Sequence, residues 1–358
     1  MKYKVEKATE KDGIEMLEII ESIPAKGAFE LIYTRRPNAY LSYQKEGDRV
    51  NVGVIKDENG KIVLQGSCIV NDYYLNNKVY PIGYVGGFRK RQDFHGKFNW
   101  MELAVNDKVS NKCDLYYCSI LSMNKHAKDV FTKKRNYMPN LEKICDYTTY
   151  IINPKIILRK KWLAKKNEYI FKKVTKKDLP NVYDFLHQEG SKYNFFPYIT
   201  NIEKEFYNLH IDNCYIMLKN NKIVSFCGLW NQTDYKQYIV TKYNRPLNIL
   251  TKLGKITETI SYIPMPKTGE VLDFPMLSFM LVENNNIELY KEFLYYLAQE
   301  IKKEYDIFVI GINNNSIINK EIYSKIRCLK FQSTLYFMNF SNKKIKHEND
   351  FYIESGLL

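Results

Sequence analysis

Three short motifs occur twice along the chain, in the same order, and this internal repetition restricts the possible folds more than any other feature. The motif Lys-Ala-Thr-Glu-Lys-Asp returns much later as Lys-Val-Thr-Lys-Lys-Asp, each time between a short strand-like segment and an amphipathic one. The repeated segments are 7–12 with 173–178, 59–63 with 220–224, and 131–135 with 323–327. A shared order of three motifs predicts two copies of one fold, with an insertion before the third motif of the second copy.

The repeat divides the 358 residues into two domains of ordinary size. We expect an N-terminal domain at 1–153, a basic linker at 154–167, a C-terminal domain at 168–341 and a polar tail at 342–358.

Helix-like and strand-like periodicities alternate within each copy, which predicts an α/β fold with a mixed sheet (α+β). Thr9 and Asp12 have the spacing of a capping box, and the turn at 57–60 predicts a hairpin. Strands are expected at 4–8, 50–55, 61–70, 78–88, 114–122, 148–152, 278–282, 307–312 and 329–340, and helices at 10–21, 124–135 and 287–304. The aromatic and basic segment 30–43 gives no clear prediction.

A basic, glycine-containing stretch at 85–98 lies between the predicted strand 78–88 and a helix-like segment at 99–105. The first N–H groups of a helix and its dipole together favour a phosphate at the helix N-terminus. Cationic or donor side chains surround this turn at Arg89, Lys90, Arg91, His95 and Lys97. Gly96 has no Cβ and permits close approach of a ligand. The stretch therefore predicts a phosphate site, and a solvated basic loop is the alternative.

The net charge of +14 favours anionic partners such as nucleotide cofactors, phosphorylated carriers, nucleic acid or a membrane surface, although a lysine-rich composition explains it equally. Seven cysteines without a CxxC pair predict free thiols in a reducing cytoplasm. The five histidines lack ligand spacing, so no metal site is expected. No signal peptide and no membrane-spanning segment is expected either.

The order strand, helix, hairpin, long strand, basic turn, helix, strand, helix, strand resembles the GNAT superfamily of acyl-CoA N-acyltransferases. The resemblance covers most of 3–153 and 168–340 and implies two tandem GNAT-like domains. The stretch 88–97 is similar to the end of the family's central strand and its pyrophosphate loop. The coenzyme-binding residues that it implies are Phe88, Arg89, Lys90, His95, Gly96 and Lys97. Phe98 and Trp100 stand where the family has small residues.

A second similarity covers 124–133, where the family commonly has an Asn that contacts the pantetheine arm and a Tyr that protonates the thiolate. Asn124 matches the first position, and Phe131 occupies the second. The candidate acids are therefore Tyr137, which is nearby, and Tyr323, which matches the Tyr position in the second copy. The second copy has no pyrophosphate loop at 282–286, and it is expected to be degenerate.

Acyl transfer to an amine requires a polarised thioester carbonyl, a base for the amine and stabilisation of the leaving thiolate. Main-chain N–H groups at Phe88 and Arg89 are the expected donors to the carbonyl. Glu102 is the candidate base, one turn into the helix after the loop, and a solvated helix carboxylate is the alternative. Arg35 and Arg36 lie where the family's acceptor-side loop usually sits, and the polar, aromatic segment 230–237 is a candidate site lining of the second half.

The resemblance implies an N-acyltransferase, with acetyl expected first as the acyl group. It would use acetyl-CoA or another acyl-CoA as co-substrate and an amine of a small molecule or peptide as acceptor, without a metal. Two alternatives stay open: a catalytically silent or acyl-carrier-protein-dependent relative, and an aminoacyl-tRNA-dependent transferase. The last predicts RNA binding through the basic cluster at 159–166, and it is the least favoured.

Overall fold

A computed structural model describes residues 3–24, 29–96, 113, 115–132, 139–160, 162, 168–243, 267–339 and 349–358. The strands are β1 (Lys4–Lys7), β2 (Phe29–Thr34), β3 (Val50–Lys56), β4 (Ile62–Leu75), β5 (Lys78–Lys90), β6 (Leu115–Leu121), β7 (Asn140–Ile152), β8 (Ile170–Lys173), β9 (Cys214–Lys219), β10 (Lys222–Asn231), β11 (Gln237–Tyr243), β12 (Pro275–Val282), β13 (Phe308–Asn313) and β14 (Leu329–Asn339). The helices are α1 (Gly13–Glu21), α2 (Ala39–Gln44), α4 (Lys125–Thr132), α5 (Pro154–Leu158), α6 (Leu179–Gly190), α7 (Ile202–Glu205), α10 (Ile287–Glu304) and α11 (Ile317–Glu321). Short 3-10 turns are η1 (Glu10–Asp12), η2 (Ile211–Asn213), η3 (Glu283–Asn285), η4 (Tyr323–Lys325) and η5 (Ser355–Leu357).

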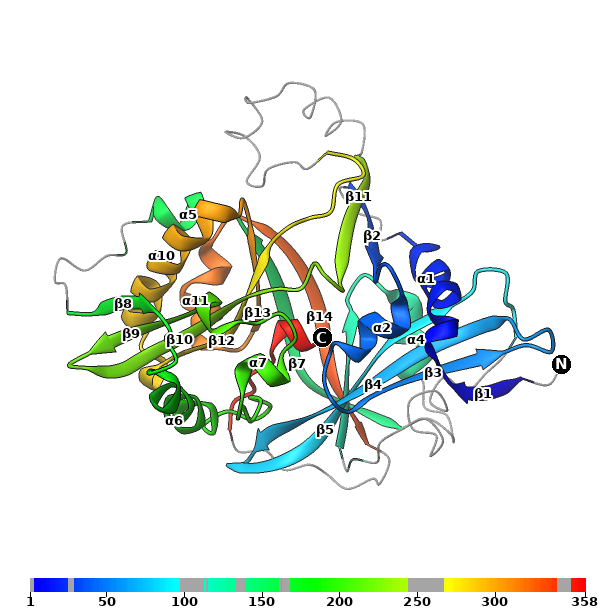
Figure 1. Cartoon of the computed structure of the whole chain (residues 1–358), viewed down its shortest axis with the longest axis horizontal. Helices are drawn as coiled ribbons and strands as arrows, with labels where there is room; N and C mark the ends of the chain where they lie inside the picture. Colours follow the sequence, from blue (N-terminus) through cyan, green and yellow to red (C-terminus); the bar gives the residue numbers. More distant parts are fainter. Residues whose placement is uncertain are drawn as a thin grey trace.

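Twelve strands form one mixed sheet in the order β1-β3-β4-β5-β6-β14-β7-β13-β12-β10-β9-β8. Read from either end towards the middle, the order has the same pattern, with β1 matching β8, β4 matching β10 and β5 matching β12. Each half contains one parallel pair, β5 with β6 and β12 with β13. The sheet is therefore built from two related halves, which lie side by side in Figure 1.

The last strands of the two halves are exchanged. β7 follows the first copy in the sequence but pairs antiparallel with β13 of the second, and β14 of the second copy pairs antiparallel with β6 of the first. The two exchanged strands also pair with each other from Leu329 with Ile151 to Asn339 with Asn140. Each half thus completes its sheet with a strand from the other.

The first repeated motif has the same local structure in both halves. The N–H and the hydroxyl of Thr9 both donate to the Asp12 carboxylate at 2.8 Å, and Thr175 donates in the same way to Asp178 at 2.9 and 2.6 Å. The bond from the Thr N–H to the Asp carboxylate is the one that a capping box contains at this position, and in both halves it lies at the start of the segment that leads into α1 or α6. The equivalence supports the prediction of two copies of one fold.

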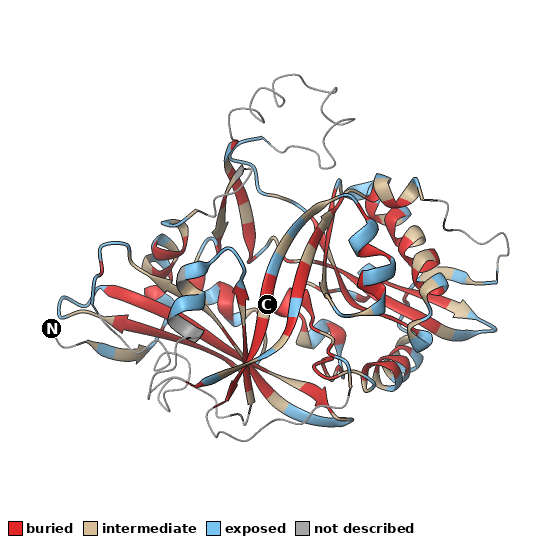
Figure 2. Ribbon diagram, turned by 180° about the vertical axis from the view of Figure 1, so that it is seen from behind, coloured by how far each residue is buried: buried red, intermediate tan, exposed pale blue. Residues whose placement is uncertain are grey.

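Helices cover both faces of the sheet, and the cores lie between the layers. In the first half, α1 and α2 cover one face, where Met16, Ile19 and Tyr43 pack on the valines of β3. In the second half, α10 and α5 lie on one face and α6 on the other. Figure 2 shows that buried residues run along the central strands from one half into the other.

A separate two-stranded sheet joins the halves, because β2 pairs antiparallel with β11. Segment 349–358 also crosses between them: it packs among residues of both halves, with Phe351, Ile353 and Leu357 buried. The chain end lies near the middle of the molecule in Figure 1.

Candidate active site

The parallel strands β5 and β6 part from each other in the first half. They pair only between 82–84 and 115–117. Beyond Tyr84, β5 continues beside β4 as far as Lys90, while β6 continues beside β14. Ligands of open α/β sheets bind at the carboxyl ends of strands where the strand order changes. This point of separation is therefore the first candidate site.

A β-bulge lies in β5 just after the strands separate. The pairing of Gln65 with Arg89 and of Ser67 with Gly86 leaves one extra residue in β5, and Gly87 there has a φ of +65°. A Cβ added to Gly87 would lie 2.4 Å from the hydroxyl oxygen of Tyr43. Glycine is thus required by both its backbone conformation and its neighbour, and bulges of this kind often re-aim the backbone beside active sites.

The second half has a matching bulge in β12, with Phe279 at the position of Gly87. Here β12 and β13 pair only at Met276 and Val309 before they separate, and Phe279 has a φ of +54°. The N–H of Phe279 donates to the Glu354 carboxylate at 2.7 Å. This bulge therefore presents a main-chain donor that binds a carboxylate oxygen.

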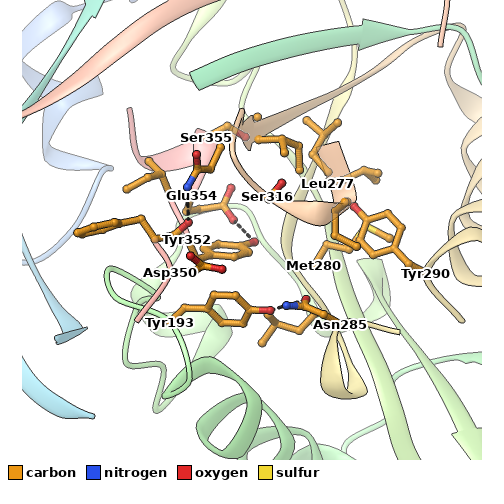
Figure 3. Close-up of a pocket in the computed structure, with 18 of the residues that line it drawn as sticks. Tyr193, Leu277, Met280, Asn285, Tyr290, Ser316, Asp350, Tyr352, Glu354 and Ser355 are labelled. Carbon is orange, nitrogen blue, oxygen red and sulfur yellow. Dashed lines mark hydrogen bonds between the residues drawn. The ribbon is translucent and has the colours of Figure 1, made fainter. Parts of the chain in front are cut away.

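A small cavity of about 80 Å³ lies between β12, β13, α10 and segment 349–358. Figure 3 shows Tyr352 and Glu354 directed into this region, with Tyr193 bonded to Asn285 beside it. The Tyr352 hydroxyl and the Gly356 N–H also donate to Glu354, at 3.1 and 3.0 Å. The space where β12 and β13 separate in the second half is thus largely filled by residues of the protein itself.

A buried cluster of charges lies behind the Gly87 bulge. The Arg35 guanidinium is 2.5 Å from the Glu46 carboxylate and lies 3.7 Å from the centre of the Tyr43 ring. Lys236 Nζ is 3.1 Å from the same Glu46 oxygen and donates to the carbonyl of Gly356 at 3.3 Å. The three charged side chains are each less than a tenth exposed. They come from both halves, so the cluster joins them.

The charges of the cluster control its protonation. Burial raises the pKa of the Glu46 carboxyl, but Arg35 and Lys236 more than offset this and hold it below the ordinary value. Burial also lowers the pKa of Lys236, against the opposing effect of Glu46. Glu46 is therefore the anion that keeps two buried cations together.

The predicted coenzyme-binding residues fall on β5 and the loop after it. Phe88, Arg89 and Lys90 form the end of β5, where Arg89 Nη1 donates to the Phe88 carbonyl at 2.9 Å. His95 and Gly96 are exposed in the loop, and a Cβ on Gly96 would meet the ring of Phe94 and the hydroxyl of Tyr3. Lys97 lies outside the described residues.

The other predicted site residues are more widely spread. Asn124 is exposed and accepts a bond from the Ala127 N–H at 3.0 Å, so it caps α4. Tyr323 is buried in the second half, where its hydroxyl lies 2.8 Å from that of Tyr290. Glu102 and Tyr137 lie outside the described residues, as do Phe98, Trp100 and most of the basic cluster at 159–166.

Glu46 and Lys236 are the residues that sequence reasoning missed at this site. The segments around them gave partial signals, since Arg35 was expected on the acceptor side and 230–237 was expected to line a site. Nothing in the sequence indicated that these segments meet, because Glu46 and Lys236 are far apart along the chain.

Comparison with known proteins defines the class of the fold. Sequence comparison finds no matching family and no matching curated protein. Solved structures share this fold at low sequence identity, and they confirm the predicted fold class, a mixed α/β sheet built from two GNAT-like halves.

Two of these structures are similar over nearly the whole chain. The N-myristoyltransferase of Saccharomyces cerevisiae with bound myristoyl-CoA has a TM-score of 0.54 at 12% identity, covering 97% of this chain and 86% of its own. A conserved protein from Enterococcus faecalis V583, described as a probable N-acyltransferase, has a TM-score of 0.51 at 8% identity, covering 94% and 72%.

Two further findings concern the described part of the chain only. None of its helices combines the length and the apolar character that crossing a membrane requires. Its His, Cys, Asp and Glu side chains also form no group suited to hold a metal ion.

Proposed function

We propose that the chain is an N-acyltransferase that takes an acyl group from an acyl-CoA thioester and passes it to an amine. The observation that carries this proposal is the pair of matching bulges at Gly87 and Phe279. In the second half the bulge N–H holds a carboxylate oxygen at 2.7 Å. The equivalent N–H of Gly87 is suited to the thioester carbonyl oxygen, on which negative charge develops during acyl transfer.

The donor lies, in this proposal, where β5 and β6 separate. The Gly87 N–H, together with the backbone at Phe88 and Arg89, polarises the thioester carbonyl. The phosphates are bound by the cationic stretch at the end of β5, and the pantetheine arm runs towards Asn124. The phosphate-binding group comprises Arg89, Lys90, His95, Gly96 and Lys97.

The acceptor amine approaches from the side of α1 and α2, where Tyr43 and the buried charge cluster lie against the bulge. Glu102 is the proposed base for the amine. Tyr137 is the proposed acid for the thiolate at this site. Tyr323 is buried in the second half, with its hydroxyl 2.8 Å from that of Tyr290, and would serve as an acid only for a thiolate bound there.

The proposal also concerns the length of the acyl chain that is transferred. Acetyl-CoA is the first donor to test, and the likeness to a transferase with bound myristoyl-CoA makes a long-chain donor the direct competitor. Acyl carrier protein is a third donor. We place the reaction in the cytoplasm, because seven free cysteines suit a reducing compartment.

Calorimetry with acetyl-CoA, myristoyl-CoA and free coenzyme A tests the proposal, together with thiol release in the presence of amine acceptors. Lys90→Glu should weaken binding of the preferred donor about tenfold, equivalent to roughly 1.4 kcal/mol. Lys222→Glu makes the same charge change on an exposed hairpin of the second half and should leave binding unchanged. Absence of binding by the wild type to every acyl donor, carrier proteins included, would refute the proposal.

A further inference from the structure

The Glu354 carboxylate occupies, in the second half, the place that the acyl carbonyl takes at Gly87 in the proposed function. Its two oxygens accept from the main chain on both sides: Oε2 from Phe279 N–H at 2.7 Å and Oε1 from Gly356 N–H at 3.0 Å. Glu354 is 3% exposed, so this anchor lies inside the protein. A bulge that could receive a ligand instead receives a side chain of segment 349–358.

The anchor fixes the next residues of the segment against the second half. Gln232 Nε2 donates to the Gly356 carbonyl at 2.8 Å. A Cβ on Gly356 would lie 2.6 Å from the Trp230 ring, so the backbone is in close contact with that ring. Because Trp230 and Glu354 are both nearly fully buried, the Gly356 carbonyl has little freedom to move.

That carbonyl is also a ligand of the charge cluster. Lys236 Nζ donates to it at 3.3 Å and lies 3.1 Å from Glu46. Glu46 holds Arg35, whose guanidinium lies on the Tyr43 ring, and the Tyr43 hydroxyl contacts the space beside Gly87. A continuous series of buried contacts therefore joins the bulge of the second half to the bulge of the first.

We propose that Glu354 is a positioning residue for the acyl-transfer site of the first half, acting through the Gly356 carbonyl, Lys236 and Glu46. The second half uses its bulge to bind its own chain, and in this way it holds the wall of the site in the other half. The inference rests on the proposed function for its consequence in catalysis, but the contact series itself can be tested without activity.

The experiment compares Glu354→Ala and Glu354→Gln with a matched control, Glu189→Ala, in the full-length chain. Glu189 is equally buried, lies in the same half and also accepts a main-chain N–H, from Asn284 at 3.2 Å. It has no bond to segment 349–358 among those the structure shows for it. Loss of a buried carboxylate is thus common to both alanine variants, and loss of the anchor is specific to Glu354.

The first measurement is the rate at which an amine-reactive reagent modifies Lys236, followed by mass spectrometry. Lys236 is 6% exposed, so its modification requires local opening. Glu354→Ala should raise the rate by about tenfold or more, because it frees the carbonyl that covers the amine. Glu354→Gln keeps one acceptor oxygen for Phe279 and should stay within about threefold of the wild type.

The second measurement is the dissociation constant and the kcat for the donor found with the wild type. We expect Glu354→Ala to weaken donor binding or kcat about tenfold in protein that remains folded by circular dichroism. We expect Glu189→Ala to change neither. A merely structural role would instead lower the thermal midpoint of both alanine variants and leave the kinetic constants of the folded fraction unchanged.

The outcomes separate the two proposals. A wild type that neither binds nor uses any acyl donor overturns the proposed function, while faster Lys236 modification in Glu354→Ala still supports the contact series. Equal Lys236 modification in Glu354→Ala and Glu189→Ala overturns the positioning role, whatever the activity. Should Glu354→Ala fail to fold, Glu354→Asp decides, because its side chain is one methylene shorter and weakens the anchor to the Phe279 and Gly356 N–H groups. Lys236 modification equal to that in Glu189→Ala overturns the role, and faster modification confined to Glu354→Asp supports it.

Discussion

Gly87→Ala tests whether the bulge of the first half is as tightly constrained as its geometry indicates. The φ of +65° makes any side chain unfavourable by roughly 1–2 kcal/mol. The added Cβ would lie 2.4 Å from the Tyr43 hydroxyl and 2.9 Å from the Ser67 hydroxyl, and such overpacking costs roughly 1–3 kcal/mol. We therefore expect a loss of unfolding free energy of roughly 2–5 kcal/mol.

Three further variants separate the backbone strain from the steric clash. Gly60→Ala introduces a side chain at a φ of +77° with no atom within 4 Å, so it should cost only the backbone strain, roughly 1–2 kcal/mol. Tyr43→Phe removes the clashing hydroxyl, so the Gly87→Ala/Tyr43→Phe double variant should recover about 1–2 kcal/mol relative to the sum of the single changes.

Urea unfolding and thermal midpoints of the wild type and the four variants provide the measurement, with the donor dissociation constant determined in parallel. Additive behaviour of the double variant would contradict the close contact between Tyr43 and Gly87. A cost for Gly60→Ala as large as that for Gly87→Ala would show that strain alone explains the effect, and the proposed packing of the bulge would be wrong.

Three further predictions concern stability. Lys236→Met removes one partner of a buried charge cluster and should cost about 3–5 kcal/mol in urea unfolding, whereas Lys222→Met, at an exposed position, should cost less than about 0.5 kcal/mol. Asp12→Ala and Asp178→Ala each remove the carboxylate that binds the preceding Thr N–H, and each should lower the free energy of unfolding by about 1 kcal/mol. The two losses should be additive in the double variant, because the two Asp residues lie in different halves. A non-additive loss would contradict their independence. The pKa of Glu46 lies below its ordinary value of 4.5, so the stabilisation by its carboxylate is present above pH 4.5 and is lost as the pH falls through the lower pKa of the folded state. In a plot of thermal midpoint against pH, Glu46→Gln should therefore make the fall at acid pH less steep. An unchanged slope at acid pH would contradict this prediction.

Local structure was largely predictable from the sequence because it depends on neighbouring residues. The helix expected at 287–304 has those bounds as α10. The strand expected at 329–340 is β14 from Leu329 to Asn339, and residue 340 lies outside the described residues. The capping box of Thr9 and Asp12 is present. In each case the periodicity or the spacing of a few residues determines the result.

Pairing between distant segments was not predictable. Segment 30–43 gave no prediction, and within it the structure forms β2 up to Thr34, whose partner β11 lies about two hundred residues later along the chain. A strand's own pattern shows which face is buried but not which strand lies beside it. The exchange of β7 and β14 is invisible in the sequence for the same reason.

The candidate site was predictable only in part. The end of β5 is a predicted part of the site because strand, charge and glycine occur together within 85–98. The cluster of Arg35, Glu46 and Lys236 was not found, since each of them reads as an ordinary surface charge until the fold buries it. Segment 349–358 was expected to be polar tail, although alternating Phe351 and Ile353 gave a signal that it packs.

The exchange of β7 and β14 between the halves has a consequence for folding during synthesis on the ribosome. When residue 153 has been synthesised, the first half still lacks the neighbour of β6, which is supplied only by residues 329–339. Until then β6 presents an unpaired edge, a surface prone to wrong partners. The sheet of the first half can consequently be completed only after residues 329–339 have emerged.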